Sequence, residues 1–218
     1  MPAEDKTELI IFQGWTLRVR HAKSPKRLLL MIHGLTGDEN SMWVFARGLP
    51  RDYWMLAPRA PHSLERGGYS WRSPQYQELD EPGLDVLRSS AGDLVQLADA
   101  YAAVVNLQSV QFDLMGFSQG AALSSALTLL FPSRVRRLAM LAGFVPGALD
   151  AVVTRRLLEG KQVFVAHGTH DELVPVKRAR QGTALLESAG ARLTICEDDV
   201  GHKVSAACLW ALDAFLAA

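Results

Sequence analysis

Residues 109–123 read SVQFDLMGFSQGAAL, an apolar run interrupted by a serine that stands between two glycines. A short apolar run that ends at a turn signal is typical of a buried strand, and the apolar segment after it is typical of a buried helix. The stretch therefore predicts a strand, a sharp turn and a helix. Two interpretations of Ser118 remain open: the serine caps the helix in an ordinary glycine turn, or the turn presents its hydroxyl for chemistry.

The same pattern of short apolar runs, each ending at a turn signal, recurs along the chain. Predicted strands cover residues 28–32, 53–57, 110–115, 137–142, 162–166 and 192–196, and predicted helices cover 90–106, 119–130, 176–189 and 204–216. Residues 9–20 alternate between apolar and polar and indicate an antiparallel hairpin at a sheet edge. Strands that alternate with helices predict one α/β domain, residues 1–218, with a mostly parallel central sheet and helices on both faces.

Amino-acid composition and net charge indicate which kinds of partner the protein is expected to bind. The 218 residues are 49% hydrophobic, which is enough to bury one core, and 23 basic residues balance 23 acidic ones. Because the formal net charge is zero, we expect no nucleic-acid partner. The apolar runs are too short for stable membrane insertion. Both a monomer and a homodimer remain compatible with these features.

The chain contains two cysteines, Cys196 and Cys208, without the spacing of metal ligands. They predict neither a metal site nor a disulfide framework, so a reducing cytoplasm is the expected location. The polar N-terminus, MPAEDKTE, lacks the apolar core of a signal peptide, which agrees with that expectation.

Residues 59–89 are rich in proline, glycine and polar side chains and predict a long loop. Loops of this length in a compact domain are usually functional or disordered. The aromatic residues Tyr69, Trp71 and Tyr76 favour an ordered loop that lines a pocket. We expect Trp71 and Tyr69 to contact the substrate, together with Leu35 and Val174 from neighbouring loops. For Leu35 and Val174, ordinary packing remains an open alternative.

The pentapeptide Gly116–Gly120 matches the G-x-S-x-G pattern of a nucleophile elbow, and it lies between a predicted strand and a predicted helix, as that motif requires. Such a turn holds the serine in a strained backbone conformation. It also places the hydroxyl at a helix N-terminus, where negative charge is stabilised.

A nucleophilic serine needs a base, and the base needs an acid that orients it. Among six histidines, His202 lies in the loop between the last predicted strand and the last helix. Asp171 follows the strand at 162–166 and gives the chain order Ser118, Asp171, His202 that this kind of sheet uses. Asp198 and Asp199 are alternative acids, but they lie so close to His202 in sequence that loop or surface roles are favoured.

An oxyanion hole requires two backbone donors. The N–H of Gln119, directly after the serine, is the first candidate. The N–H of Leu35, which follows the predicted strand at 28–32, is the second, with Thr36 as the alternative. We interpret His33 as structural, with its ring bonded to a backbone group.

Together, four motifs resemble those of the phospholipase/carboxylesterase family of α/β-hydrolases, which includes the acyl-protein thioesterases. They are HGLTGDE (33–39), GFSQGAAL (116–123), HGTHDELVP (167–175) and GH (201–202), and PRAP (58–61) and GGYSW (67–71) are similar to the bacterial carboxylesterase branch. The resemblance implies an α/β-hydrolase fold without a large cap domain and a Ser118–His202–Asp171 triad. It also implies Leu35 and Gln119 as oxyanion donors, esters or thioesters of short to medium acyl chains as substrates, and no metal or organic cofactor.

Three segments depart from the thioesterase pattern and leave the substrate open. The first loop reads Leu-Thr-Gly-Asp, Lys203-Val204 follow the last histidine, and residues 73–87 form an acidic stretch without a counterpart. Alternatives are another activity on the same fold, such as a lipase or lysophospholipase, a dienelactone-type hydrolase or a peptidase, and a non-catalytic binding module. Dienelactone hydrolases usually carry cysteine at the nucleophile position.

Overall fold

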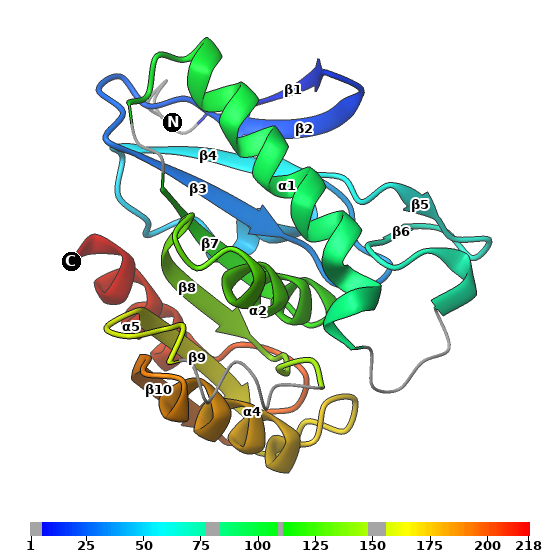
Figure 1. Cartoon of the computed structure of the whole chain (residues 1–218), viewed down its shortest axis with the longest axis vertical. Coiled ribbons are helices and arrows are strands. Elements are labelled where there is room, and N and C mark those ends of the chain that lie inside the picture. The colour runs from blue at the N-terminus through cyan, green and yellow to red at the C-terminus, as the bar shows by residue number, and fades with distance from the viewer. Residues whose placement is uncertain (1–5, 77–82, 109–110, 148–155) are drawn as a thin grey trace.

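A central eight-stranded sheet organises the computed structural model, which describes residues 6–76, 83–108, 111–147 and 156–218 (Figure 1). The strands lie in the spatial order β1-β2-β4-β3-β7-β8-β9-β10. Their bounds are β1 Thr7–Phe12, β2 Trp15–Arg20, β3 Arg27–Ile32, β4 Tyr53–Pro58, β7 Phe112–Phe117, β8 Val135–Leu141, β9 Gln162–Gly168 and β10 Arg192–Asp198.

Strand direction decides where the turns meet. Each neighbouring pair from β4 through β10 is parallel, whereas β1 and β2 form an antiparallel hairpin that joins the sheet through β4. The predicted parallel sheet with an antiparallel edge is thus confirmed. Since parallel strands end at the same edge, the turns after β3, β7, β9 and β10 are brought together there.

The described helices cover both faces of the sheet. They are α1 Leu84–Val104, α2 Gln119–Leu130, α4 Val176–Ser188 and α5 Ala206–Ala217, with short 3₁₀ turns η2 Ser41–Phe45 and η3 Pro74–Tyr76. Alternate residues of β3 supply two separate cores, because successive side chains of a strand point to opposite faces. Leu28 and Leu30 pack in the core that includes α1 and α2, and Leu29 and Met31 pack in the core that includes α5.

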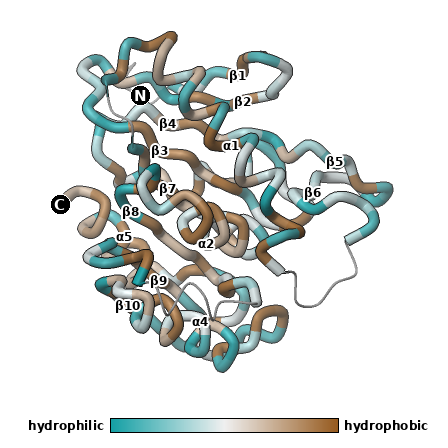
Figure 2. Tube along the Cα trace, in the orientation of Figure 1, coloured by the Kyte–Doolittle hydropathy of each residue, from teal (hydrophilic) through white to brown (hydrophobic). Residues whose placement is uncertain are grey.

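Hydropathy follows this layering. In Figure 2 the inner strands and α2 are coloured as hydrophobic, and the edge hairpin β1–β2 is paler or hydrophilic over much of its length. Nearly every residue of α2 is buried, as its almost wholly apolar sequence predicts. The helix that follows the serine turn is therefore fixed in the interior, and this fixes the turn itself.

The predicted loop at residues 59–89 is partly wrong. A short hairpin of β5 His62–Ser63 and β6 Tyr69–Ser70 lies within it, and α1 begins at Leu84, six residues before the predicted start at 90. Leu84, Leu87 and Leu94 lie on the packed side of that helix at helical spacing, but the serines and glycine among them obscure the period. Residues 77–82, the middle of the acidic stretch at 73–87, lie outside the described residues.

The two cysteines are joined, contrary to the prediction. Cys196 in β10 and Cys208 in α5 form a disulfide with their Cα atoms 5.6 Å apart. A separation of twelve residues does not reveal that the last strand and the last helix pack side by side. Because the two cysteines are paired, they no longer favour a reducing compartment as the location of the protein. Among the described helices, none is long and apolar enough to cross a bilayer.

Candidate active site

The turn between β7 and α2 holds Ser118 in an unusual conformation. Its backbone has φ 54° and ψ −116°, in a region that L-residues rarely adopt, so the predicted strain is confirmed. The turn also requires its glycines. A Cβ on Gly116 would lie 2.3 Å from the Gly120 carbonyl oxygen, and one on Gly120 would lie 2.1 Å from the carbonyl oxygen of Ile32. The Ser118 side chain makes no capping hydrogen bond to α2, which weighs against the capping interpretation.

Three side chains from separate turns meet above the sheet edge. The Nε2 atom of His202 lies 3.0 Å from Ser118 Oγ, and its Nδ1 atom lies 2.7 Å from Asp171 Oδ2. Because a carboxylate can only accept, Nδ1 carries the proton and Nε2 of the neutral ring accepts from the serine hydroxyl. The ring of Phe117 lies 5.1 Å from the imidazole and bounds it on one side. This arrangement can transfer a proton from Ser118 to His202.

Asp171 is almost completely buried and is held by its own turn. Its Oδ1 atom accepts hydrogen bonds from the N–H groups of Leu173 at 2.9 Å and Val174 at 2.8 Å. His167, at the end of β9, lies against the same carboxylate, with Nε2 2.8 Å from the Val174 carbonyl oxygen and 3.5 Å from Asp171 Oδ2. The sequence pattern predicts no role for His167, although this residue opens the motif that contains Asp171.

The two alternative acids are engaged elsewhere. Asp199 pairs with His170 at the surface. Hydrogen bonds from the Ser205 hydroxyl and from the N–H of Asp199 lower the pKa of Asp198. The carboxylate that contacts His202 is that of Asp171.

The candidate oxyanion donors are the N–H groups of Leu35 and Gln119, and both residues line one pocket with Ser118. The N–H of Thr36, the alternative oxyanion donor, donates to the Tyr69 carbonyl oxygen at 3.0 Å. Because this N–H is already used, Thr36 is not favoured as an oxyanion donor. Within the described part of the chain, the N–H groups of Leu35 and Gln119 donate to no backbone carbonyl. Gln119 is the first residue of α2, where an N–H has no partner within the helix.

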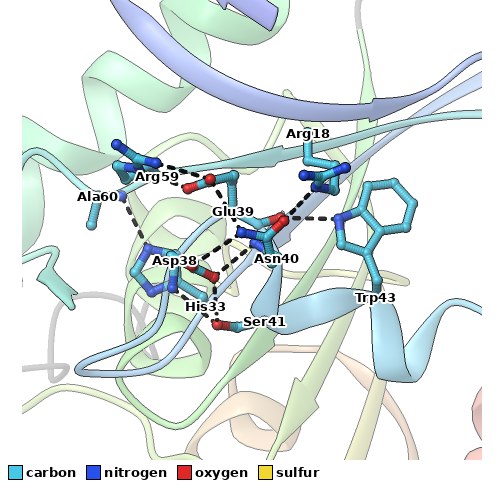
Figure 3. Close-up of polar contacts among 9 residues, drawn as sticks. All are labelled: Arg18, His33, Asp38, Glu39, Asn40, Ser41, Trp43, Arg59 and Ala60. Carbon is cyan, nitrogen blue, oxygen red and sulfur yellow. Dashed lines mark hydrogen bonds and ion pairs between the residues drawn. The ribbon is translucent and has the colours of Figure 1, made fainter. Parts of the chain in front are cut away.

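A polar scaffold fixes the loop that carries Leu35 (Figure 3). His33 accepts from the N–H of Ala60 at its Nε2 atom, and its Nδ1 atom bonds the Gly34 carbonyl oxygen at 2.7 Å. Burial lowers the pKa of this histidine and keeps it neutral, so its structural interpretation is confirmed. Arg59 holds the buried carboxylate of Glu39 through two hydrogen bonds of 2.7 and 2.9 Å.

The structure corrects the prediction for Trp71. This side chain has no solvent exposure, and its indole N–H donates to the His33 carbonyl oxygen at 2.9 Å. It is therefore part of the core beneath the site rather than a surface that a substrate contacts. The side chain of Gln119 reaches back to it, since Oε1 accepts the backbone N–H of Trp71 at 2.9 Å. The G-x-S-x-G pattern predicts a role for the backbone N–H of Gln119 but none for its side chain.

A pocket of about 120 Å³ opens beside the serine. Its described lining consists of Leu35, Arg72, Leu87, Ser118, Gln119, Ala122 and Phe144. Of the expected substrate contacts, only Leu35 is part of this lining. Tyr69 is half-buried with its ring 4.8 Å from the Arg59 guanidinium, and Val174 is buried beside Asp171, so their substrate roles remain predictions.

Known proteins of similar sequence and fold include both enzymes and a protein named as inactive. The chain is 27% identical over 189 residues to acyl-protein thioesterase 1 of Debaryomyces hansenii, covering 78% of this chain and 80% of that protein. It is 28% identical over 203 residues to a probable inactive carboxylesterase of Oryza sativa, covering 84% and 81%. The crystal structure of a carboxylesterase from Mesorhizobium loti superposes with a TM-score of 0.82 at 21% identity, covering 98% and 99%, which establishes the α/β-hydrolase fold. The model of the Phospholipase/Carboxylesterase family matches residues 17–218, and the chain belongs to that family.

Proposed function

We propose that the protein is a serine hydrolase that cleaves carboxylic esters, or thioesters, of short acyl chains through an acyl-enzyme intermediate. The observation that supports this most directly is the pair of contacts on His202, 3.0 Å to Ser118 Oγ and 2.7 Å to Asp171 Oδ2. A neutral imidazole between a serine hydroxyl and a buried carboxylate is the arrangement that activates serine as a nucleophile.

In the first half-reaction, Ser118 Oγ attacks the acyl carbon while its proton moves to Nε2 of His202. The oxyanion accepts hydrogen bonds from the N–H groups of Leu35 and Gln119. As the intermediate collapses, His202 donates the proton to the leaving alcohol or thiol. Water then attacks the acyl-enzyme by the same route, and Asp171 stabilises the imidazolium in both halves.

The pocket supports short acyl groups. Its volume of about 120 Å³ is small beside the ~300–1,000 Å³ of typical small-molecule pockets. Phe144 and Ala122 bound the space with apolar surface, which suits an alkyl chain and not a long polar peptide. The comparison with a relative named as inactive raises the binding-module alternative, but this chain retains a serine, a histidine and an aspartate in contact.

The test is hydrolysis of p-nitrophenyl esters from acetate to palmitate by the wild type and by Ser118→Ala. We expect an optimum at short chains in the wild type and a loss of kcat of about 10⁴-fold or more in the variant. Phe144→Ala, which enlarges the pocket, should move the optimum to longer chains while leaving the acetate rate largely unchanged. Wild-type hydrolysis by folded Ser118→Ala would reject the proposed nucleophile.

A further inference from the structure

The loop that carries His202 is closed at its base by the disulfide. Cys196 lies in β10, two residues before the strand ends at Asp198, and Cys208 lies in the first turn of α5. His202 stands midway between the two cysteines in sequence. Whatever moves the start of α5 relative to the end of β10 therefore also moves this imidazole.

The loop has few other anchors. None of residues 199–205 is fully buried, although Val204 is partly buried and packs against the core that includes α5. Its first half is tied to the neighbouring turn, since the N–H of His170 donates to the Val200 carbonyl oxygen at 3.0 Å. At its other end, Ser205 caps α5 by accepting from the N–H of Cys208 at 3.2 Å, and its hydroxyl also bonds the Asp198 carboxylate.

The contacts of His202 leave little tolerance for displacement. The imidazole must stay within hydrogen-bond reach of Ser118 on one side and of Asp171 on the other. Ser118 is held in place by the buried helix α2. Asp171 is itself buried and is held by hydrogen bonds within its own turn. The histidine loop is thus the part of the triad whose position depends on the covalent link.

We propose that the Cys196–Cys208 disulfide positions His202 for catalysis, so that its reduction reversibly lowers the activity of the folded enzyme. The inference rests on the proposed function. A dithiol is the reductant: it supplies two electrons and two protons, the S–S bond breaks, two S–H groups form, and the dithiol becomes a cyclic disulfide. Cys196 is only partly buried, which gives the attacking thiolate access, whereas Cys208 is almost fully buried.

The experiment measures kcat and KM for p-nitrophenyl butyrate in the oxidised wild type, in the wild type reduced with dithiothreitol, and in a Cys196→Ala, Cys208→Val variant. Titration of free thiols before and after treatment shows whether the disulfide is present and whether it has been reduced. Far-UV circular dichroism verifies that the protein remains folded. Hydrogen exchange of the peptide covering residues 199–205, compared with that of α2, reports whether loosening is local. The double variant, with and without dithiothreitol, controls for effects of the reagent.

We expect kcat to fall by about 10- to 100-fold on reduction with KM little changed, because a displacement of about 1 Å in a catalytic group can cost ~10²-fold. Exchange should rise at 199–205 but not in α2, reoxidation should restore kcat, and the double variant should be slow and insensitive to dithiothreitol. The proposal is overturned by two free thiols in the untreated enzyme, by unchanged kcat after reduction, or by unfolding of both the reduced enzyme and the double variant. An oxidised wild type without esterase activity would reject the proposed function as well.

Discussion

At the scale of single residues, Ser118 combines chemistry with backbone strain. Its φ of 54° with ψ of −116° is accessible to glycine but costly for a residue with a Cβ. Such strained positions cost about 1–3 kcal/mol each and tend to lie at active sites. The fold retains the conformation because β7 and the buried helix α2 fix both ends of the turn.

This strain can be measured by comparing Ser118→Gly with Ser118→Ala. Neither variant has a nucleophile, so both should be inactive, but only alanine retains the strained Cβ. Relief of the strain favours the glycine variant, but glycine also gives up more conformational freedom on folding, which costs ~0.5–1 kcal/mol. We expect the glycine variant to be more stable than the alanine variant by about 1 kcal/mol net. Urea unfolding of both proteins supplies the comparison. An alanine variant of equal or greater stability would contradict the strain at this position.

His167 contributes to the site without contacting the serine. Its Nε2 atom bonds the Val174 carbonyl oxygen and lies beside the Asp171 carboxylate, whereas its buried Nδ1 atom has no hydrogen-bond partner among the described residues. The ring therefore closes the turn that presents Asp171. Removing a buried donor of this kind costs stability, because the acceptor it bonded is left without a hydrogen bond.

We predict that His167→Leu loses about 1–3 kcal/mol of stability and lowers kcat, because the Val174 carbonyl oxygen is left unsatisfied and the Asp171 turn loosens. His167→Gln, whose amide nitrogen can replace the Nε2 donor, should recover much of both. Steady-state kinetics and urea unfolding of the pair test this. Equal behaviour of the leucine and glutamine variants would indicate that volume, rather than the hydrogen bond, is what matters.

At the scale of elements, close backbone packing seats α2 against β3. The hypothetical Cβ of Gly120 falls 2.1 Å from the Ile32 carbonyl oxygen, so no side chain fits between helix and strand. Gly92 in α1 offers the opposite case, because a Cβ there meets no atom within 4 Å. The two positions form a matched pair for the same substitution.

Gly120→Ala should destabilise the protein by about 1–3 kcal/mol through overpacking, and it should lower kcat because the displaced helix carries Ser118 and Gln119 with it. Gly92→Ala should instead stabilise by about 0.4–1 kcal/mol, since it only reduces the freedom of the unfolded chain. Thermal unfolding and ester hydrolysis of both variants measure these effects. A Gly120→Ala protein with wild-type stability would show that the helix can shift without cost.

At the scale of the whole molecule, stability should depend on pH through the ion pair between the buried Glu39 and the partly exposed Arg59. The two hydrogen bonds from Arg59 lower the pKa of Glu39 below its ordinary 4.5, and the Glu39 side chain is only 3% exposed. Since the folded-state pKa is depressed, the unfolded chain binds the proton first as pH falls. The stabilisation is thus fully present above the ordinary pKa and is lost as pH falls through the folded-state value.

The difference in unfolding free energy between wild type and Glu39→Gln should therefore be largest near neutral pH and should shrink as pH falls from about 5. Urea unfolding across that range measures it. Glu159, which pairs with Arg156 at an exposed surface position, is the control, and Glu159→Gln should have little measurable effect across this range. A pH-independent difference for Glu39→Gln would show that the charge is not what Arg59 stabilises.

The sequence by itself determined the parallel sheet, the strained serine turn and the family. These features are encoded locally: apolar runs of strand length bury on both faces, and glycines on either side of Ser118 permit one tight turn. The order of Ser118, Asp171 and His202 along the chain also pointed to one edge of the sheet. Their arrangement into a triad remains a proposal that the Ser118→Ala experiment tests.

Only the tertiary structure decided which distant groups meet. It joined Cys196 to Cys208 and placed Trp71 in the core, with its indole bonded to the His33 carbonyl oxygen. Neither follows from local pattern, because each depends on how two elements pack after the chain between them has folded. Burial and disulfide pairing are properties of distances in space, and sequence separation constrains such distances only weakly.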